Sequence, residues 1–529
     1  MQTDLRKLTV AWPLAIILLL PALTRADTAG QAWVQRYNGP ANGNNEANAV
    51  AVDGSNNVIV TGASTKSGSG YDYATIKYSS AGIALWTNRY NGPGNGDDEP
   101  AAVAVDSGNN VIVTGYSMGS SGYEDYATIK YSSDGVPLWT NRYKGPGGME
   151  DVATAVAVDG GNNVLVTGYS WGGEGSWYDY ATIKYSSAGV PLWTNRYNGP
   201  GSLADLAYAV AVDGSNNVIV TGASTGGGFS FNYATVEYSS AGVPLWTNRY
   251  SGPGNGPDQA NAVAVDGSNN VIVTGYSTGS NSYDYATIKY SGAGAPLWTN
   301  RYNGPGNGDD EAQAIASDGS NNVIVTGYSA GSNGYFNYNY ATLEYSSAGV
   351  PLWTNRYIGP ANGPDEATAV AVDAGNNVVV TGYSTNSDSG YDYATIKYSS
   401  AGVPLWTNRY NGPGNANDLA RALAVDHSGN VIVTGYSTGS GGEYDFATVK
   451  YLAVLSPVLN ALGLTSRGFL LQVADVMQPG TLVIAACANL STTNWTPVFT
   501  NTTPTNVVFY TDPSAANLST RFYRAFQFP

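Results

Sequence analysis

Acidic side chains are the chemistry-bearing residues that this sequence supplies in quantity. It holds 39 Asp and Glu residues, but His427 is its only histidine and Cys487 its only cysteine. His427 falls in a "VDHSGN" turn, where we expect an exposed structural residue, so no Ser-His-Asp, Cys-His or zinc-ligand set is predicted. Paired carboxylates could instead serve as the acid and base of a glycosidase. We favour a non-enzymatic protein, with a polysaccharide hydrolase or lyase acting through such carboxylates as the alternative.

An acidic position recurs at one fixed place, eight residues before the Asp that ends a Val-rich segment. Its residues are Asp98, Asp151, Asp205, Asp258, Asp310, Asp365 and Asp418, with Asn45 in the first copy. If the copies form a ring, these carboxylates surround a central channel and could collect Ca²⁺ or a cationic ligand. An Asp at the start of a strand also caps backbone N–H groups, and we favour that interpretation. We therefore expect no metal site and no cofactor, with at most a weak dependence on Ca²⁺.

Aromatic residues in a few loops are the candidate ligand-binding residues. They are Trp171, Trp177, Tyr178, Phe229, Phe231, Tyr335 and Phe336. Exposed rings stack on sugars or anchor a protein partner, whereas rings folded over neighbouring strands would only support the structure. The segment with Trp171 and Trp177 is the strongest single candidate for binding.

The elements that position these residues repeat along the chain. Tryptophans recur every 52 to 55 residues, at Trp33, Trp86, Trp139, Trp193, Trp246, Trp298, Trp353 and Trp406. Each unit has four strand-like segments, as in "AVAVD", "NVIVTGYS", "DYATIKYS" and "PLWTNRY", which we name a, b, c and d. Four strands in a period of this length predict the blade of a β-propeller.

The two ends of the repeat region complement each other. Eight a-b-c sets are present, but the first d segment precedes all of them and none follows the last set. Pairing these two pieces closes a ring and covers an exposed sheet edge. The sequence therefore predicts an all-β, eight-bladed propeller closed by an N-terminal outer strand. The predicted blades are residues 46–90, 99–143, 152–197, 205–250, 259–302, 312–357, 366–410 and 419–451, the last completed by residues 31–37.

Length differences between the units fall in one loop. The interval from each repeat tryptophan to the Asp that ends segment a is always 20 residues, and only the b–c loop changes in length. Antiparallel strands put the b–c and d–a loops on one face of the disc, here the variable face. The a–b and c–d turns lie on the other, the uniform face. Loops on a rigid scaffold usually carry binding, so we expect the ligand on the variable face.

Two recurrent motifs are interpreted as structural. The "VDGSNN" turns lack the spacing of a calcium-binding EF-hand and suit a hairpin in which Asp and Asn bond to their own turn. The Trp and Arg of "WTNRY" recur in all eight units, which indicates packing between blades.

The repeat resembles a known family. The order "AVDGSNNVIVTGYS…YDYATIKYSSAGVPLWTNRY" is similar to the bacterial β-propeller repeat called SBBP, over about residues 31–451. The resemblance implies a propeller fold in exported or surface proteins, mostly without an assigned activity. The family name suggests seven blades, and this sequence offers eight.

The N-terminal segment has the features of a secretory signal peptide. Basic Arg6 and Lys7 precede an apolar run, and small residues end at Ala26, so residues 1–26 are expected to be removed. Removing three basic residues and one acidic residue moves the net charge from −16 to −18. Such a chain should repel nucleic acid and anionic lipid. We expect a secreted, periplasmic or surface protein, not inserted in a membrane after cleavage.

The repeat ends at Tyr451, and a different composition follows. After a linker at 452–458, residues 459–529 offer short strands typical of a small β-sandwich-like domain. The pattern "ANLSTTNWTPV…FYTDP…RFYRAF" resembles a C-terminal module of exported multidomain bacterial proteins. Cys487 lies in an apolar strand and is expected to be a buried small hydrophobe. With one cysteine the chain has no internal disulfide.

Together these features predict an exported, monomeric binding or scaffold protein. The expected partner is polysaccharide or another surface protein, recognised through the variable face, with no nucleic acid bound. A purely structural surface protein is the further alternative.

Overall fold

The computed structural model describes residues 29–66, 70–173, 175–228, 230–280, 282–331, 337–361, 363–387, 390–453, 458–465, 467–474, 481–487, 496–502, 507–514 and 522–528. The chain divides into two compact units. One is Gln31–Leu452, and the other combines Met1–Gly30 with Ala453–Pro529. The first unit contains the repeats.

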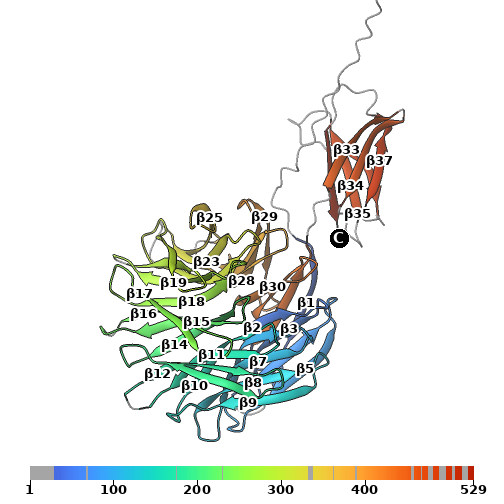
Figure 1. Ribbon diagram of the computed structural model, residues 1–529. Coiled ribbons are helices and arrows are strands. Elements are labelled where there is room, and N and C mark those ends of the chain that lie inside the picture. Colours follow the sequence, from blue (N-terminus) through green and yellow to red (C-terminus); the bar gives the residue numbers. More distant parts are fainter. Residues whose placement is uncertain are drawn as a thin grey trace, which may run out of the picture. The chain divides into compact units, whose positions relative to one another are not determined.

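Eight four-stranded antiparallel sheets make up the described residues of Gln31–Leu452, with no α-helix among them (Figure 1). The all-β, eight-bladed prediction is confirmed. We number the sheets as blades 1 to 8 in chain order, and the strands of each blade keep the positions a to d.

The strands of the first four blades repeat one pattern of lengths. Their bounds are β2 (Asn45–Val52), β3 (Val58–Thr65), β4 (Tyr71–Tyr78) and β5 (Ala84–Tyr90) in blade 1; β6 (Asp98–Val105), β7 (Val111–Met118), β8 (Glu124–Tyr131) and β9 (Pro137–Tyr143) in blade 2; β10 (Asp151–Val158), β11 (Val164–Trp171), β12 (Tyr178–Tyr185) and β13 (Pro191–Tyr197) in blade 3; β14 (Asp205–Val212), β15 (Val218–Thr225), β16 (Phe231–Tyr238) and β17 (Pro244–Tyr250) in blade 4.

The last four blades continue the pattern. Their bounds are β18 (Asp258–Val265), β19 (Val271–Thr278), β20 (Tyr283–Tyr290) and β21 (Pro296–Tyr302) in blade 5; β22 (Asp310–Ser317), β23 (Val323–Ala330), β24 (Tyr338–Tyr345) and β25 (Pro351–Tyr357) in blade 6; β26 (Asp365–Val372), β27 (Val378–Thr385), β28 (Tyr391–Tyr398) and β29 (Pro404–Tyr410) in blade 7; β30 (Asp418–Val425), β31 (Val431–Thr438), β32 (Tyr444–Tyr451) and the N-terminal β1 (Gln31–Tyr37) in blade 8.

The ring is closed by its first strand. β1 pairs antiparallel with β32, with Trp33 opposite Lys450 and Tyr37 opposite Phe446. The inner strands of neighbouring blades contact one another around the ring, including β2 with β30. The surplus d segment of the sequence is therefore the outer strand of blade 8.

The hydrophobic core lies between successive blades. Between blades 2 and 3, Ile112 and Tyr126 pack with Val164, Val166 and Ile183 in one buried cluster. Fully burying a side chain of this size contributes about 1.5–3 kcal/mol. The same positions recur in each blade, so the repeat itself specifies one core for each pair of neighbours.

The constant glycine of each "TG" pair has a steric reason. Strand a carries a β-bulge, which in blade 2 lies between Pro100 and Ala102. A Cβ on Gly115 of the neighbouring strand would stand 2.1 Å from Glu99 O at this bulge. Only glycine lets strand b approach the bulged strand this closely.

The repeated Trp and Arg bridge the blades, as the sequence indicated. Trp86 of blade 1 donates its Nε1–H to Ser133 O of blade 2 at 3.1 Å. Its ring lies against Gly135 of the same turn, where φ is +85° and a Cβ would meet Trp86 Cγ at 2.7 Å. Arg142 of blade 2 donates to Tyr90 of blade 1 at 3.0 Å.

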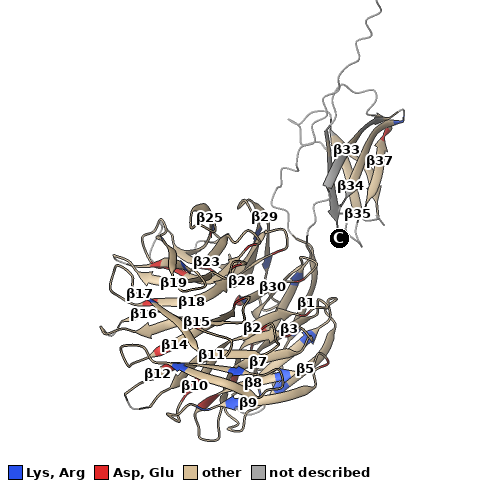
Figure 2. Cartoon of the chain, viewed as in Figure 1, with Lys and Arg blue, Asp and Glu red and all other residues tan. Residues whose placement is uncertain are grey.

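A buried ion pair lies beside the uniform face in most blades, and charged residues occur within the sheets as well as in loops (Figure 2). In blade 3, Lys184 Nζ lies 2.8 Å from Asp159 Oδ2 in the a–b turn and donates to Ser240 O of blade 4 at 3.0 Å. The equivalent pairs in the described residues are Lys77–Asp53, Lys130–Asp106, Lys289–Asp266, Lys397–Asp373 and Lys450–Asp426. Burial works to raise the pKa of Asp159, but hydrogen bonds from Lys184 and Asn163 outweigh it and lower that pKa.

The a–b turns are also linked from blade to blade. Asn109, at φ +62°, accepts a hydrogen bond from Gly54 N of blade 1 at 2.8 Å. Across the closure, Asn56 Oδ1 accepts from the backbone N of His427 at 3.0 Å. His427 itself is an exposed turn residue. Equivalent hydrogen bonds join the successive turns from blade 2 to blade 7, whereas blade 8 has Gly429 in place of the linking Asn.

The C-terminal unit contains two three-stranded sheets among its described residues. The first consists of β33 (Val458–Thr465), β34 (Gly468–Ala474) and β37 (Val508–Asp512), and the second of β36 (Thr496–Asn501), β35 (Thr481–Cys487) and β38 (Phe522–Phe528). Leu471, Val473, Leu482, Ile484 and Tyr523, from both sheets, share one core. Strand β33 was not predicted from the sequence. The side chain of Cys487 lies outside the described residues. In the described part of the chain, no helix is long and apolar enough to cross a membrane.

Candidate functional site

The loops of blade 3 meet on the variable face. Asp151 at the start of β10 pairs with Ser170, and Trp171 at the end of β11 pairs with Tyr178 at the start of β12. The d–a loop before β10 reaches this corner, since Gly147 N donates to Trp171 O at 3.3 Å. The register of the strands therefore brings Trp171 and Tyr178 to the rim of the variable face.

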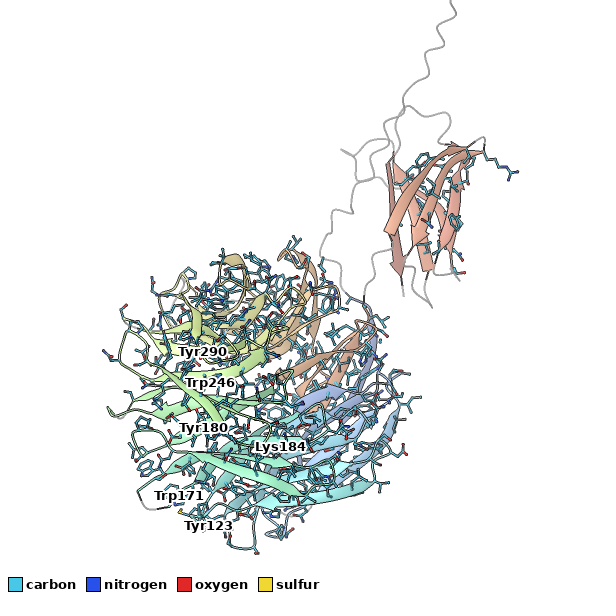
Figure 3. All side chains as sticks on the ribbon, in the orientation of Figure 1. Tyr123, Trp171, Tyr180, Lys184, Trp246 and Tyr290 are labelled. Carbon is cyan, nitrogen blue, oxygen red and sulfur yellow. The ribbon has the colours of Figure 1, made fainter. Side chains whose placement is uncertain are left out.

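Two aromatic rings pack edge-on against Tyr178. Its ring centroid lies 5.2 Å from that of Trp171 and 5.3 Å from that of Tyr169, both edge-on. Trp171, which Figure 3 labels, lies against the d–a loop, because a Cβ on Gly147 would clash with its Cδ1. Trp177, the residue before Tyr178, is 55% exposed. The cluster therefore combines two fixed rings with one ring open to solvent.

Carboxylates adjoin these rings. The hydroxyl of Tyr178 donates to Glu150, and burial together with this hydrogen bond raises the pKa of Tyr178. Burial also raises the pKa of Glu124, at the start of β8, and the nearby charge of Glu150 adds to the effect. The corner thus offers apolar ring faces beside hydrogen-bond acceptors.

The other predicted aromatic residues are not gathered in this way. Phe231 stands opposite Thr225 at the start of β16 and is half-buried. Phe229, Tyr335 and Phe336 lie outside the described residues. Of the aromatic candidates, the described structure brings together Trp171 and Tyr178, with the exposed Trp177 as the residue before Tyr178.

The recurrent Asp residues at the start of strand a are fully buried. They are Asp98, Asp151, Asp205, Asp258, Asp310, Asp365 and Asp418. Asp98 accepts hydrogen bonds from Gly92 N at 2.8 Å and from Met118 N at 3.1 Å. Burial raises its pKa against the opposing hydrogen bonds from Ser117 and Gly92. These carboxylates hold the d–a loop against the end of strand b and face away from solvent.

The central channel holds a cavity that sequence reasoning missed. Its volume is about 600 Å³, and its polar lining includes Asn48, Gln313, Glu366, Thr368 and Arg421 from strand a. Most of these residues occupy the bulged position of strand a, where each blade inserts one residue that the ladder leaves unpaired. A recognisable signal exists in the sequence, since this position varies from blade to blade while the residues on either side are almost always Ala.

Charges of both signs border this cavity. Arg421 of blade 8 forms an ion pair with Glu46 of blade 1 at 2.9 Å, and its guanidinium lies 5.0 Å from the ring centroid of Tyr436. Burial raises the pKa of Glu366, although a hydrogen bond from Tyr383 opposes the shift. The channel mouth is therefore polar and partly neutralised rather than a ring of free carboxylates.

A comparison with curated proteins finds a repeat-containing relative. No family model matches the chain. It is 24% identical to an uncharacterised WD repeat-containing protein of Acanthamoeba polyphaga mimivirus, over 64% of this chain and 33% of that protein. The chain thus spans about a third of the length of this relative.

Solved structures give distant likenesses. The crystal structure of a eukaryotic initiation factor matches with a TM-score of 0.40 and 8% identity, over 68% of this chain and 77% of the other. A gluconolactonase from Xanthomonas campestris matches with a TM-score of 0.29 and 12% identity, over 55% of this chain and 90% of that chain.

Proposed function

We propose that this chain is an exported, non-enzymatic binding protein that recognises a polysaccharide through the variable face of blade 3. The observation that carries the proposal is the exposed Trp177 beside the fixed pair Trp171 and Tyr178. Ring faces stack on the C–H surface of a sugar, and the carboxylates of Glu124 and Glu150 can accept hydrogen bonds from its hydroxyls. A closed propeller with a repeat-containing relative is consistent with a binding or scaffold role.

Export rests on the leader at residues 1–26, which lies outside the described residues. The same proposal includes the SBBP-type character of the repeats. It also includes a sandwich-like fold and an export-related role for the C-terminal module. The mature chain is expected to act as a monomer at the cell surface or beyond it.

The first test is a glycan array read together with a screen for polysaccharide hydrolysis and lyase activity. We expect retention on at least one class of glycan without release of sugar. Turnover would contradict a non-enzymatic role and favour the channel carboxylates Glu46 and Glu366 as reacting groups. Retention on none of the glycans would contradict polysaccharide recognition and favour a protein partner or a structural role.

A further inference from the structure

Two blades depart from the buried ion pair of the other six. In blades 4 and 6, strand c carries Glu237 and Glu344 where the other blades have Lys. The opposing turn residues, Asp213 and Asp318, are still acidic. A Lys–Asp pair has therefore become a Glu–Asp pair at the same place in the fold.

These glutamates point into the protein. Glu237 is 1% exposed and Glu344 is 2% exposed. In blade 6 a single amide connects the two carboxylates, because Asn322 Nδ2 lies 2.9 Å from Glu344 Oε1 and 3.0 Å from Asp318 Oδ2. The acidic groups thus share one buried pocket beside the a–b turn.

Oxygen atoms in both pockets are without a partner. Neither carboxylate oxygen of Glu237 has a partner with good hydrogen-bond geometry, and weak hydrogen bonds from Trp246 and Asn217 only partly oppose the rise that burial gives its pKa. Oε2 of Glu344 is unpartnered in the same way. Leaving a buried carboxylate uncompensated strongly destabilises a folded protein. Each pocket therefore needs a proton or a bound cation to balance the charge of its buried carboxylates.

The Lys blades indicate where a cation is accommodated. There the Lys184 ammonium stands between Asp159 Oδ2 and the backbone carbonyl of Ser240 in the next blade. The equivalent carbonyls in the two Glu blades belong to Gly292 and Ser400, which accept from Trp246 Nε1 at 3.4 Å and Trp353 Nε1 at 3.3 Å. A Glu side chain is one bond shorter than Lys. A cation at the ammonium position would therefore face the Glu and Asp carboxylates and one carbonyl oxygen.

A shared proton would provide partners for fewer of these oxygens than a bound cation would. One proton joins a single oxygen of the glutamate to one acceptor and leaves the other oxygen of Glu237 without a partner. Burial and the charge of Asp213 do raise the pKa of Glu237, so protonation is the competing state. A hard divalent cation instead accepts several oxygen ligands at once and balances both carboxylates.

We propose that the pockets of Glu237 with Asp213 and of Glu344 with Asp318 each bind a hard divalent cation of the Ca²⁺ class. The carbonyls of Gly292 and Ser400 complete the protein ligands, and water supplies the rest. Among the described residues, no three acidic, His or Cys side chains are placed so that they could hold a metal ion together, so backbone and water oxygens are required. This departs from the expectation of no metal drawn from the sequence, and it is independent of the sugar-binding proposal.

Terbium luminescence tests the sites directly, because Trp246 and Trp353 border the two pockets and can sensitise a bound Tb³⁺ ion. The full chain is compared with the double variant Glu237→Lys and Glu344→Lys, which restores the residue of the other six blades. We expect wild-type emission that Ca²⁺ competes away, and a several-fold loss of emission in the double variant. Equal emission from the two proteins, or no emission from the wild type, would overturn the proposal.

Thermal unfolding separates the cation from the proton. The variant Glu237→Gln with Glu344→Gln imitates the protonated glutamates. If a cation binds, Ca²⁺ raises the Tm of the wild type above its value in chelator, and the Gln variant does not respond. A wild-type Tm that Ca²⁺ does not change, and that equals the Tm of the Gln variant at neutral pH, would show a shared proton and contradict the cation site.

Discussion

The two faces of the propeller use the same repeat differently. On the uniform face, turns of fixed length are joined by recurrent contacts such as Lys184–Asp159 and Gly54–Asn109. On the variable face, the b–c loops change in length and blade 3 presents Trp177 to solvent. The comparison indicates that one face holds the ring together while the other is free to acquire a ligand. Substitutions on the first face should change stability, and those on the second should change binding.

The uniform face is uniform in length but not in charge. Blades 4 and 6 replace the buried Lys with Glu on this face, and at the variable-face end of strand c they replace the Asp that pairs with the d-strand Arg by Asn232 and Asn339. In blade 2, that Asp is Asp125, which contacts Arg142 at 2.8 Å. These two blades have therefore lost both ion pairs together, and a bound cation would compensate for one of them.

Removing the closing strand should have the largest effect, because it opens both faces at once. Deleting residues 27–40 takes away β1 and exposes the edge of β32. We expect a loss of more than about 5 kcal/mol in the free energy of unfolding, above the usual range for a single substitution. Exposed edges also promote association, so size-exclusion chromatography should show larger species. An unchanged melting curve would contradict closure by β1.

Breaking one buried ion pair should destabilise the protein without changing ligand binding. Lys184→Met leaves Asp159 buried and uncompensated, which costs about 3–5 kcal/mol. Urea unfolding measures the change. Adding Asp159→Asn removes the charge that remains, so the double variant should recover much of the loss. A single variant as stable as the wild type would show that this pair does not support the uniform face.

The two faces should respond to pH in opposite directions. Burial favours a higher pKa for Asp53, Asp106 and Asp159, but hydrogen bonds from Lys and Asn outweigh it, and the folded pKa is lowered. Their contribution is present above the unfolded pKa of about 4 and is lost as pH falls through the folded pKa. Burial raises the pKa of Glu99 and Glu366 on the variable side, so their contribution is lost as pH rises through the folded pKa.

Melting temperatures measured from acid to neutral pH check these signs. The acid loss should be smaller in Lys184→Met, which lacks one of the pairs, than in the wild type. A wild-type Tm that rises as pH falls below about 4 would contradict the lowered pKa values of these carboxylates.

The links between turns should have the smallest effect. Asn109→Gly keeps the positive φ but loses the hydrogen bond to Gly54, which should remove about 0.5–1.5 kcal/mol from stability. Asn109→Ala loses the same bond and adds about 1–2 kcal/mol of backbone strain. Denaturant midpoints of the two variants separate these contributions. If Ala proves no worse than Gly at this position, the strained turn is not a determinant of stability.

Most of the fold could be predicted from the sequence, because the constant spacing within the repeat fixes the place of each strand in its blade. The surplus segment around Trp33 identified the closing strand, and the constant intervals assigned the loops to faces. The channel lining was missed because the bulge in strand a changes which residues point inward, as at Asn48 and Arg421. The Glu pockets were missed because Lys184 and Asp159 are far apart in sequence, and alternation alone does not show which side chains meet between strands. Strand β33 lacked a strong alternating pattern next to the predicted linker.

The most direct test of recognition through blade 3 is the affinity of Trp177→Ala for the glycan retained by the wild type, measured by isothermal titration. Leu192→Ala is the matched control, because Leu192 is 51% exposed on the outer strand of the same blade. We expect Trp177→Ala to weaken binding by about 2 kcal/mol or more, roughly thirty-fold in Kd, without lowering Tm. Leu192→Ala should bind as the wild type does. Equal affinity of Trp177→Ala and the wild type would contradict recognition through the variable face of blade 3.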